Sequence, residues 1–201
     1  MNSKKIVEEG YDKIADWFHK DRKTTRATLF FLRKVFSKLP KKGRVLDLGC
    51  GTGYPAAKFF SEKGYEVMGV DISERMLKIA KGVVPDGKFI KKDMTKINFP
   101  KNSFDIIVSF QSILHIPKNE QKKLLQKVYE ILNPEGKILI SVTSNKGGEY
   151  INNWMGKTKM FWNETSKKDN LALIEKIGFK IILTSDVGPK NDLHVYILAE
   201  K

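Results

Sequence analysis

Three glycines at every second position are the residues of this chain best suited to hold a ligand. Gly49, Gly51 and Gly53 follow the apolar run 44–48, which is typical of a buried parallel strand, and precede helix-forming residues that begin at Pro55. Glycine permits positive φ angles and close backbone approach, so the amides of this turn and the next helix N-terminus can face a ligand. The unit therefore predicts a site for a nucleotide-like molecule.

Acidic residues mark the ends of the first three predicted strands. Asp47 lies near the end of the first strand, Asp71 ends the second, and Asp93 follows the third. Because ligands of open α/β sheets lie beyond the carboxyl ends of the central strands, these side chains are expected at one site. Asp71 comes about twenty residues after the glycine turn, the spacing at which a carboxylate accepts both ribose hydroxyls of a bound nucleoside.

The register of the glycines argues against a dinucleotide cofactor. Dinucleotide enzymes use G-x-G-x-x-G, in which the third glycine lets the helix pack closely on the strand. In that register, starting from Gly49, the third place is Tyr54. A dinucleotide-dependent oxidoreductase is therefore the least favoured of the functions considered.

The apolar pattern predicts the elements that position these residues. Helices are expected near 6–18, 25–39, 55–60, 74–80, 118–132 and 166–177, and strands at 44–48, 65–71, 88–92, 104–110, 137–142, 179–184 and 193–199. Turns are expected at 133–136 and at Gly188-Pro189. Strands alternating with helices and followed by a hairpin predict an α/β fold: one doubly wound, mostly parallel seven-stranded sheet with helices on both faces and an antiparallel C-terminal edge strand.

Residues 1–201 are expected to form a single domain. Helices within 1–39 are expected to cover the ligand pocket, and residues 143–165 lack steady periodicity although they are rich in aromatic residues. A loop of that length is uncommon unless it is functional or disordered, so the segment is predicted to be a substrate-side lid. Packing of its aromatic residues over the sheet edge is an equally open interpretation.

The composition bounds the class of protein. The net charge of +14, from 37 basic and 23 acidic residues, invites a nucleic-acid partner, but the lysines are interleaved with acids and favour a solvated surface. Cys50 is the single cysteine, which excludes an intrachain disulfide and a cysteine-based zinc site. No run of eighteen apolar residues occurs, so we expect a soluble, cytoplasmic protein without membrane insertion.

The segment Asp47–Gly53, with the sequence D-L-G-C-G-T-G, resembles the first motif of class I, Rossmann-like S-adenosylmethionine-dependent methyltransferases. Segments 66–73, 92–94, 104–109 and 132–140 resemble later motifs of that family in the same order. The resemblance covers about residues 40–142 and is closest to the small-molecule branch that includes quinone-biosynthesis methyltransferases. It implies the Rossmann-like methyltransferase fold, S-adenosyl-L-methionine as cofactor, and methyl transfer as the activity.

The resemblance assigns the glycine turn to one end of the cofactor. The amides of Gly49, Cys50, Gly51 and Gly53 would border the methionine portion and the ribose. Asp47 would orient the ammonium group of the cofactor, directly or through water.

The two following strands would hold the nucleoside. Asp71 would bind the ribose hydroxyls, and Ile72 and Met76 would lie against the adenine face, although plain core positions are equally open for these two. Asp93 would accept from the adenine amino group beside the amide of Met94.

Two further contacts follow from the same resemblance, and a catalytic role follows from the position of one histidine. Phe110 would supply a carbonyl near the amino group of the methionine portion, and Tyr11 would close the pocket. The chemistry is an in-line displacement in which positioning can supply roughly 7–11 kcal/mol. His115 lies just beyond the fourth strand, where the acceptor would approach, and its unperturbed pKa suits a general base. The alternative is that His115 only packs or hydrogen-bonds there.

The acceptor is less defined than the cofactor. No Asn/Asp-Pro-Pro-aromatic sequence follows the fourth strand, and neither a magnesium nor a zinc site is indicated. A small-molecule acceptor is favoured, with its N, O or C atom open. The alternatives are an RNA or protein methyltransferase that uses the basic N-terminal half, and a noncatalytic S-adenosylmethionine-binding module. Oligomeric state is not indicated.

Overall fold

A computed structural model describes residues 2–21, 25–143, 147–188 and 193–201. The elements in chain order are α1 Ser3–Asp21, α2 Arg26–Phe36, β1 Arg44–Leu48, α3 Ala56–Ser61, β2 Glu66–Asp71, α4 Glu74–Val83, β3 Lys88–Lys91, η1 Met94–Lys96, β4 Phe104–Phe110, η2 Ile113–His115, α5 Lys118–Ile131, β5 Leu132–Thr143, β6 Gly147–Trp154, β7 Thr158–Glu164, α6 Lys167–Ile177, β8 Lys180–Val187 and β9 His194–Glu200. The expected fold class is confirmed.

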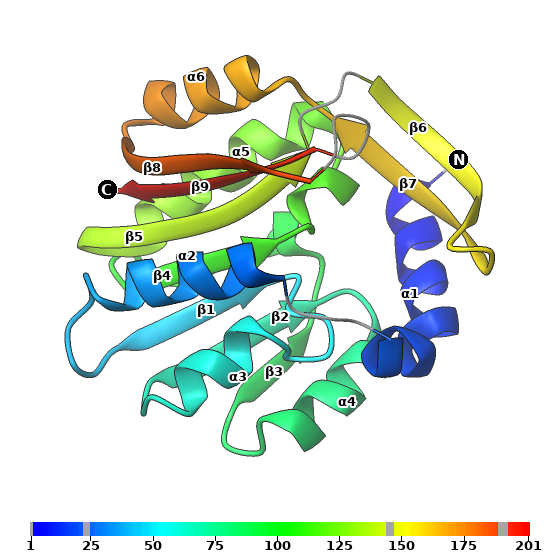
Figure 1. The fold of residues 1–201 in the computed structure, drawn as a ribbon, viewed down its shortest axis with the longest axis horizontal. Coiled ribbons are helices and arrows are strands. Elements are labelled where there is room, and N and C mark those ends of the chain that lie inside the picture. Colours follow the sequence, from blue (N-terminus) through cyan, green and yellow to red (C-terminus); the bar gives the residue numbers. More distant parts are fainter. Residues whose placement is uncertain (1, 22–24, 144–146, 189–192) are drawn as a thin grey trace.

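The central sheet has seven strands in the order β3-β2-β1-β4-β5-β9-β8 (Figure 1). Strands β3, β2, β1, β4 and β5 are parallel to one another. The chain moves outward from β1 through β2 to β3 and then returns to the other side of β1 as β4. This reversal opens a crevice beyond the carboxyl ends of β1 and β4, where ligands of doubly wound sheets bind.

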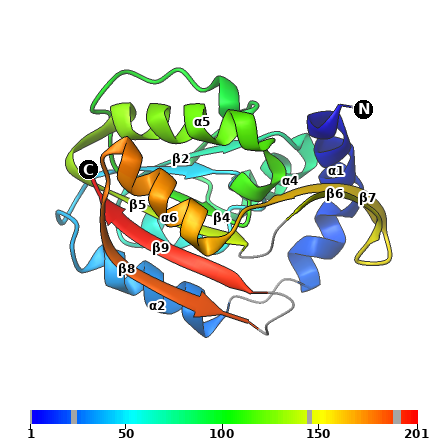
Figure 2. The same ribbon diagram turned by 90° about the horizontal axis from the view of Figure 1, so that it is seen from above.

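Hydrophobic side chains on both faces of the sheet build two cores. Leu46 and Ile107 point to the face covered by α5 and α6, whereas Val45 and Ile106 point to the face covered by α2 and α3 (Figure 2). Neighbours along a strand alternate between the faces, and both faces are buried, which explains why these strands read as continuous apolar runs. The helices on both sides fix the ends of the strands that carry the predicted site.

The C-terminal hairpin completes the sheet. Strand β9 is antiparallel to β5 and to β8, so it is the antiparallel C-terminal strand that the sequence predicts. It lies one position inside the sheet, and β8 occupies the edge. Residue Pro189 of the predicted turn lies outside the described residues.

The long loop expected over 143–165 is wrong as a conformation, because most of the segment folds as the two-stranded hairpin β6–β7, and the lid role of the segment stays a prediction. Its register shifts between Ile151 and Trp154, and Met155 and Gly156 have φ angles of 53° and 67° where the chain turns. The register shift interrupts the two-residue alternation that identifies a strand in sequence. The hairpin lies beside α1 at one end of the sheet (Figures 1 and 2).

Strand β5 also begins earlier than predicted. The expected turn at 133–136 falls within β5, where the pairing with β4 shifts register and Glu135 has a φ of 60°. The backbone is thus irregular at 133–136, where the sequence predicts a turn. Among the described residues, no helix combines the length and apolar character needed to cross a membrane.

Candidate functional site

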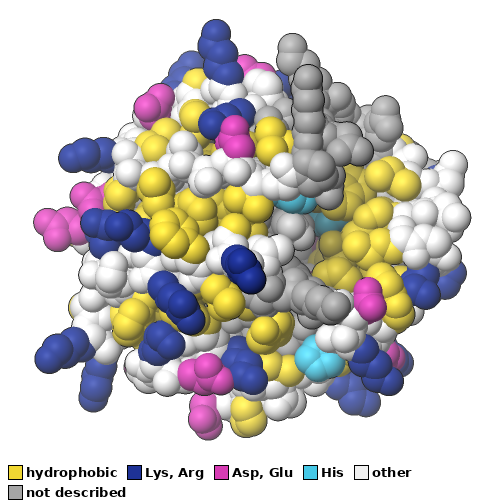
Figure 3. All heavy atoms as spheres, in the orientation of Figure 1, with side chains coloured by type: hydrophobic (Ala, Val, Ile, Leu, Met, Phe, Trp, Pro, Cys, Tyr) yellow, Lys and Arg dark blue, Asp and Glu magenta, His cyan; other side chains and the backbone are white. Residues whose placement is uncertain are grey.

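A pocket of about 440 Å³ lies beyond the carboxyl ends of β1, β2, β3 and β4. Helix α1 and the β6–β7 hairpin contribute residues to its outer wall, whereas α2 packs against the sheet and contributes none. Figure 3 shows a hollow on this side of the molecule whose visible walls are largely hydrophobic. Of the twelve predicted cofactor-binding residues, nine line the pocket: Tyr11, Gly49, Gly51, Asp71, Ile72, Met76, Asp93, Met94 and Phe110.

The glycine turn forms the floor of the pocket. The amides of Gly49 and Cys50 both donate to the carbonyl of Val70, at 2.7 and 3.1 Å, which ties the turn to β2. Gly49 has a φ of 70°, and a Cβ at this position would lie 2.3 Å from the Cβ and Oγ of Ser112. Only glycine therefore fits here, because it lets Ser112 pack against the turn, and Gly49 also lines the pocket.

Asp71 is fixed by the backbone around it. Its Oδ2 accepts from the amide of Gly51 at 2.8 Å, and its Oδ1 accepts from the amide of Ser73 at 2.9 Å. Burial raises the pKa of Asp71, amide hydrogen bonds from Ser73, Gly51 and Ile72 counteract this rise, and the charge of Asp12 adds to it. The carboxylate lines the pocket beside Ile72, and its remaining lone pairs suit hydroxyl donors.

Asp93 already has partners in the structure. Its Oδ1 accepts from the amide and hydroxyl of Thr95 at 2.9 and 2.8 Å, and its Oδ2 lies 2.9 Å from the ammonium of Lys4. Burial works to raise the pKa of Asp93, but the bonds and charge of Lys4 and Thr95 lower it below its ordinary value. Contact with an adenine amino group stays a prediction, and the structure adds an ion pair across the same end of the pocket.

Three predicted residues do not line the pocket. Asp47 is 3% exposed and is not part of the pocket lining. Cys50 is buried with its sulfur close to Gly69, and burial, followed by the charges of Asp71 and Asp47, raises the pKa of its thiol well above the ordinary value. Gly53 has a φ of 76° and lies against Ala80, so it lets α4 pack closely on the turn. Their contacts with a cofactor stay predictions.

His115 and Tyr11 meet on the opposite wall. The Nε2 of His115 lies 2.8 Å from the Tyr11 hydroxyl, and its Nδ1 lies 2.7 Å from the carbonyl of Phe161. Burial lowers the pKa of His115 to about 4, with the bond to Phe161 opposing the shift, so the ring is neutral at pH 7. A carbonyl only accepts, so Nδ1 carries the proton, and Nε2 accepts from the Tyr11 hydroxyl.

This geometry changes the basis of the predicted catalytic role. The sequence favoured His115 as a base because an unperturbed imidazole titrates near neutrality, but a pKa of about 4 makes it a weaker base. The location of His115 still suits the role, because its side chain lines the pocket together with Tyr11. The role as a general base therefore stays a prediction that rests on the unprotonated Nε2, which accepts from the Tyr11 hydroxyl, and on its location in the pocket.

The structure adds pocket residues that were not among the predicted site residues, although those of the hairpin lie in the segment predicted to be a substrate-side lid. The hairpin contributes Ile151, Trp154, Met155 and Trp162, α1 contributes Lys4, Val7 and Phe18, and strand ends contribute Gln111, Ser112, Thr143 and His194. His194, the first residue of β9, pairs with Thr143 at the edge of the sheet that carries the site. Because β9 runs antiparallel to β5, its first residue lies beside the last residue of β5. This pairing is the signal from which His194 could have been predicted at the site.

Rings from separate elements pack on one another at this wall. The Trp162 ring lies 5.0 Å from His115 and 5.8 Å from Trp154, and the Tyr11 ring lies 5.7 Å from Trp154, measured between centroids. The pocket therefore has two parts. One is polar and lies at the strand ends, and the other is mainly aromatic and lies under α1 and the hairpin. No cluster of three or more metal-ligating side chains occurs among the described residues.

Residues 45–136 match the family model of a methyltransferase domain. Phosphoethanolamine N-methyltransferase 2 of Caenorhabditis elegans is 30% identical over 165 residues, which cover 78% of this chain and 37% of that protein. Demethylmenaquinone methyltransferase of Renibacterium salmoninarum is 34% identical over 102 residues, which cover 51% of this chain and 42% of that protein. The chain spans less than half the length of the first curated relatives it matches.

A solved structure shares the fold over almost the whole chain. It is the 1,6-didemethyltoxoflavin-N1-methyltransferase of Burkholderia thailandensis, with bound 1,6-didemethyltoxoflavin and S-adenosylhomocysteine. The TM-score is 0.74 at 20% identity, and the match covers 99% of this chain and 86% of the other. At that identity the likeness shows the fold.

Proposed function

We propose that this chain, which belongs to the class I S-adenosylmethionine-dependent methyltransferases, transfers a methyl group from S-adenosyl-L-methionine to a small acceptor with a substantial apolar or aromatic part. The observation that carries the proposal is the fixed carboxylate of Asp71 on the pocket wall, beside the glycine turn and the apolar side chains of Ile72 and Met76. A carboxylate next to bare backbone and an apolar wall fits a ribose joined to an adenine.

The residues present fit the cofactor. Gly49 and Gly51 line the pocket without side chains, Asp71 places a carboxylate beside them, and Met76 offers an apolar surface to a flat base. When bound, the cofactor supplies a methyl group on a positively charged sulfur, which is already activated toward displacement. The chain then contributes position, and orientation of two reactants can supply a large part of a rate enhancement.

The acceptor's proton has a defined destination in this proposal. Where the attacking atom must lose a proton, the Tyr11 hydroxyl and the unprotonated Nε2 of His115 are the polar pair that faces it. Nε2 can take the proton only if Nδ1 keeps its own, and the Phe161 carbonyl holds the ring in that tautomer. Where the acceptor needs no deprotonation, the same pair orients it.

The location of the aromatic part favours a small acceptor over a macromolecular one. Trp154 and Trp162 come from the hairpin and Phe18 comes from α1, so the acceptor wall is formed by the elements that cover the pocket. An RNA or a protein chain would need these elements to move aside. The names of the relatives include small-molecule methyltransferases with chemically different acceptors, in line with an acceptor atom that the fold does not fix.

Calorimetry with S-adenosylmethionine tests the proposal. Asp71→Ala is expected to bind the cofactor about ten- to a hundredfold more weakly, because hydrogen bonds to a charged group contribute about 1.5–3 kcal/mol. Asp86→Ala removes an exposed carboxylate and is the matched control. Absence of binding by the wild-type chain, or unchanged binding by Asp71→Ala, would sink the proposal.

The acceptor is then sought with labelled methyl donor. A cell extract is separated into small-molecule, RNA and protein fractions, and each is incubated with the chain and donor. Label in the small-molecule fraction supports the proposal, and label that is confined to RNA or protein contradicts it. Cofactor binding without transfer to any fraction would leave a noncatalytic binding module as the better description.

A further inference from the structure

One face of α1 carries a stripe of charged residues with a spacing of four. Lys4, Glu8, Asp12 and Asp16 therefore lie in line along the helix. Each contacts the part of the molecule that borders the cofactor end of the pocket. Lys4 contacts Asp93 and Glu120, and Glu8 contacts Lys91 at 2.9 Å. Asp12 accepts from the Ser73 hydroxyl at 2.6 Å and the Arg75 amide at 3.1 Å, and Asp16 pairs with the Arg75 guanidinium. We call this row of contacts the polar seam.

The other side of α1 packs tightly on the hairpin. A Cβ at Gly10 would lie 2.9 Å from the carbonyl oxygen of Lys159 and 2.9 Å from the Cε of Met160. Met160 is fully buried, and the Tyr11 ring lies against Trp154. Parting α1 from the hairpin would expose this apolar surface, whereas parting the polar seam mainly exchanges ion pairs and hydrogen bonds for contacts with water.

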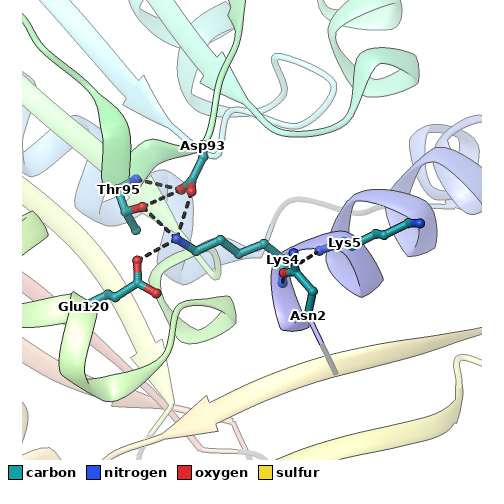
Figure 4. Close-up of polar contacts among 6 residues, drawn as sticks. All are labelled: Asn2, Lys4, Lys5, Asp93, Thr95 and Glu120. Atoms are coloured by element: carbon teal, nitrogen blue, oxygen red, sulfur yellow. Dashed lines mark hydrogen bonds and ion pairs between the residues drawn. The ribbon is translucent and has the colours of Figure 1, made fainter.

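Lys4 is the member of the seam that reaches into the pocket. Its ammonium lies 2.9 Å from Asp93 Oδ2, 2.5 Å from Glu120 Oε2 and 2.9 Å from the Thr95 hydroxyl (Figure 4). Its side chain is 25% exposed, compared with 32% for Glu8 and 62% for Asp16. One cation thus joins α1 to the turn after β3 and to α5.

The charge state of Lys4 supports this role. Burial works to lower the pKa of Lys4, but the hydrogen bonds and charges of Asp93 and Glu120 outweigh burial and raise it. The ammonium is therefore charged at neutral pH. Lys4 and Asp93 both line the pocket, at the end where the family resemblance implies the adenine.

We propose that Lys4 is a positioning residue that latches α1 over the adenine end of the cofactor, and that the cofactor enters and leaves when the polar seam parts. The proposal rests on the cofactor site of the proposed function. The helix and the hairpin stay joined by their apolar contact, so the seam is the side that opens. Ion pairs in a partly exposed seam are screened by salt, which makes its opening sensitive to ionic strength.

The rate of cofactor release tests the latch. The probe is S-adenosylhomocysteine, its release is followed by stopped-flow tryptophan fluorescence after dilution or chase, and its affinity is measured by calorimetry. Lys4→Met is expected to speed release about tenfold, because the loss of a hydrogen bond to a charged group changes a binding constant by about that factor. Lys4→Arg keeps the charge and is expected to restore slow release. Raising the KCl concentration is expected to speed release from the wild-type chain more than from Lys4→Met.

Lys5→Met is the matched control. Lys5 is the next residue of α1 and points away from the pocket, where it pairs with Glu9 at 3.6 Å on the exposed surface (Figure 4). The release rate of Lys5→Met is expected to stay within about twofold of the wild-type rate, because exposed ion pairs contribute little free energy. Equal release rates for Lys4→Met, Lys5→Met and the wild type would overturn the latch.

A second variant keeps the test decisive if Lys4→Met does not fold. Glu120→Gln weakens the hold on Lys4 from α5, and Glu120 is not among the residues that line the pocket. Its release is expected to be faster than that of the wild type, and a wild-type rate would contradict the latch. Failure of the proposed function is distinguishable, because in that case the wild-type chain binds no S-adenosylhomocysteine at all.

Discussion

Replacing His115 by Gln tests the electrostatics of the acceptor wall through the pH dependence of stability. In the folded chain burial lowers the pKa of His115 to about 4, compared with about 6.5 for a solvated imidazole. The unfolded chain therefore binds a proton between these values that the folded chain does not. The contribution of His115 to the free energy of unfolding is therefore complete above pH 6.5. It decreases as the pH drops and is fully lost below pH 4.

The size of the effect follows from the shift. Each pKa unit corresponds to about 1.4 kcal/mol, so a shift of this extent contributes roughly 3 kcal/mol in total, of which about 2 kcal/mol is lost by pH 5. His115→Gln cannot titrate and lacks this contribution. The free energy of unfolding of the wild-type chain should therefore fall by about 2 kcal/mol more than that of the variant between pH 7.5 and 5.

Guanidinium unfolding at a series of pH values measures this difference. His19→Gln is the control, because His19 is exposed near the end of α1. Its curve should follow that of the wild type, while the curve of His115→Gln flattens. Parallel curves for all three chains would show that His115 is not held neutral, and the assignment of its tautomer and of the Tyr11 hydrogen bond would fail with it.

The remaining predictions concern the fold that holds the site. Gly49→Ala should destabilise the chain by about 3 kcal/mol or more, because its Cβ would clash with Ser112 and the residue has a φ of 70°. Gly64 has a similar φ of 78° but open space around it, so Gly64→Ala should cost only about 1 kcal/mol. Equal losses in guanidinium unfolding would refute the steric account. Tyr196→Phe should cost about 1 kcal/mol, because it removes the buried hydrogen bond to the Thr28 hydroxyl at 2.7 Å. Wild-type stability in thermal unfolding would contradict that cost.

The cofactor side of the site was predictable because local patterns encode it. Strands β1 and β4 were predicted to the residue, and Ser73 caps α4 by accepting from the Met76 amide. Parallel strands bring their carboxyl ends to one edge, so a carboxylate at the end of β2 must face the glycine turn after β1. Asp71 could therefore be placed without knowledge of any side-chain contact.

The parts that were missed depend on contacts between distant residues. The ion pair between Lys4 and Asp93 joins residues 89 positions apart, and nothing near Lys4 distinguishes it from Lys5 until α1 is docked. The pKa of His115 depends on burial under Phe161 and its neighbours, which follows only from the position of the hairpin. The hairpin escaped detection because its register shift breaks the alternation on which strand prediction relies.

The same division explains why the donor can be argued further than the acceptor. Apart from Tyr11 on α1, the residues expected to touch the donor lie at or after the ends of neighbouring parallel strands, so one backbone arrangement fixes them together. The acceptor wall is assembled from α1 near the start of the chain and from a hairpin inserted after β5, and these elements meet only through packing such as the contact of Gly10 with Met160. A change in Trp154 or Trp162 can therefore alter the acceptor without disturbing Asp71 or the glycine turn. Acceptor choice in this chain should accordingly be sought in α1 and the β6–β7 hairpin.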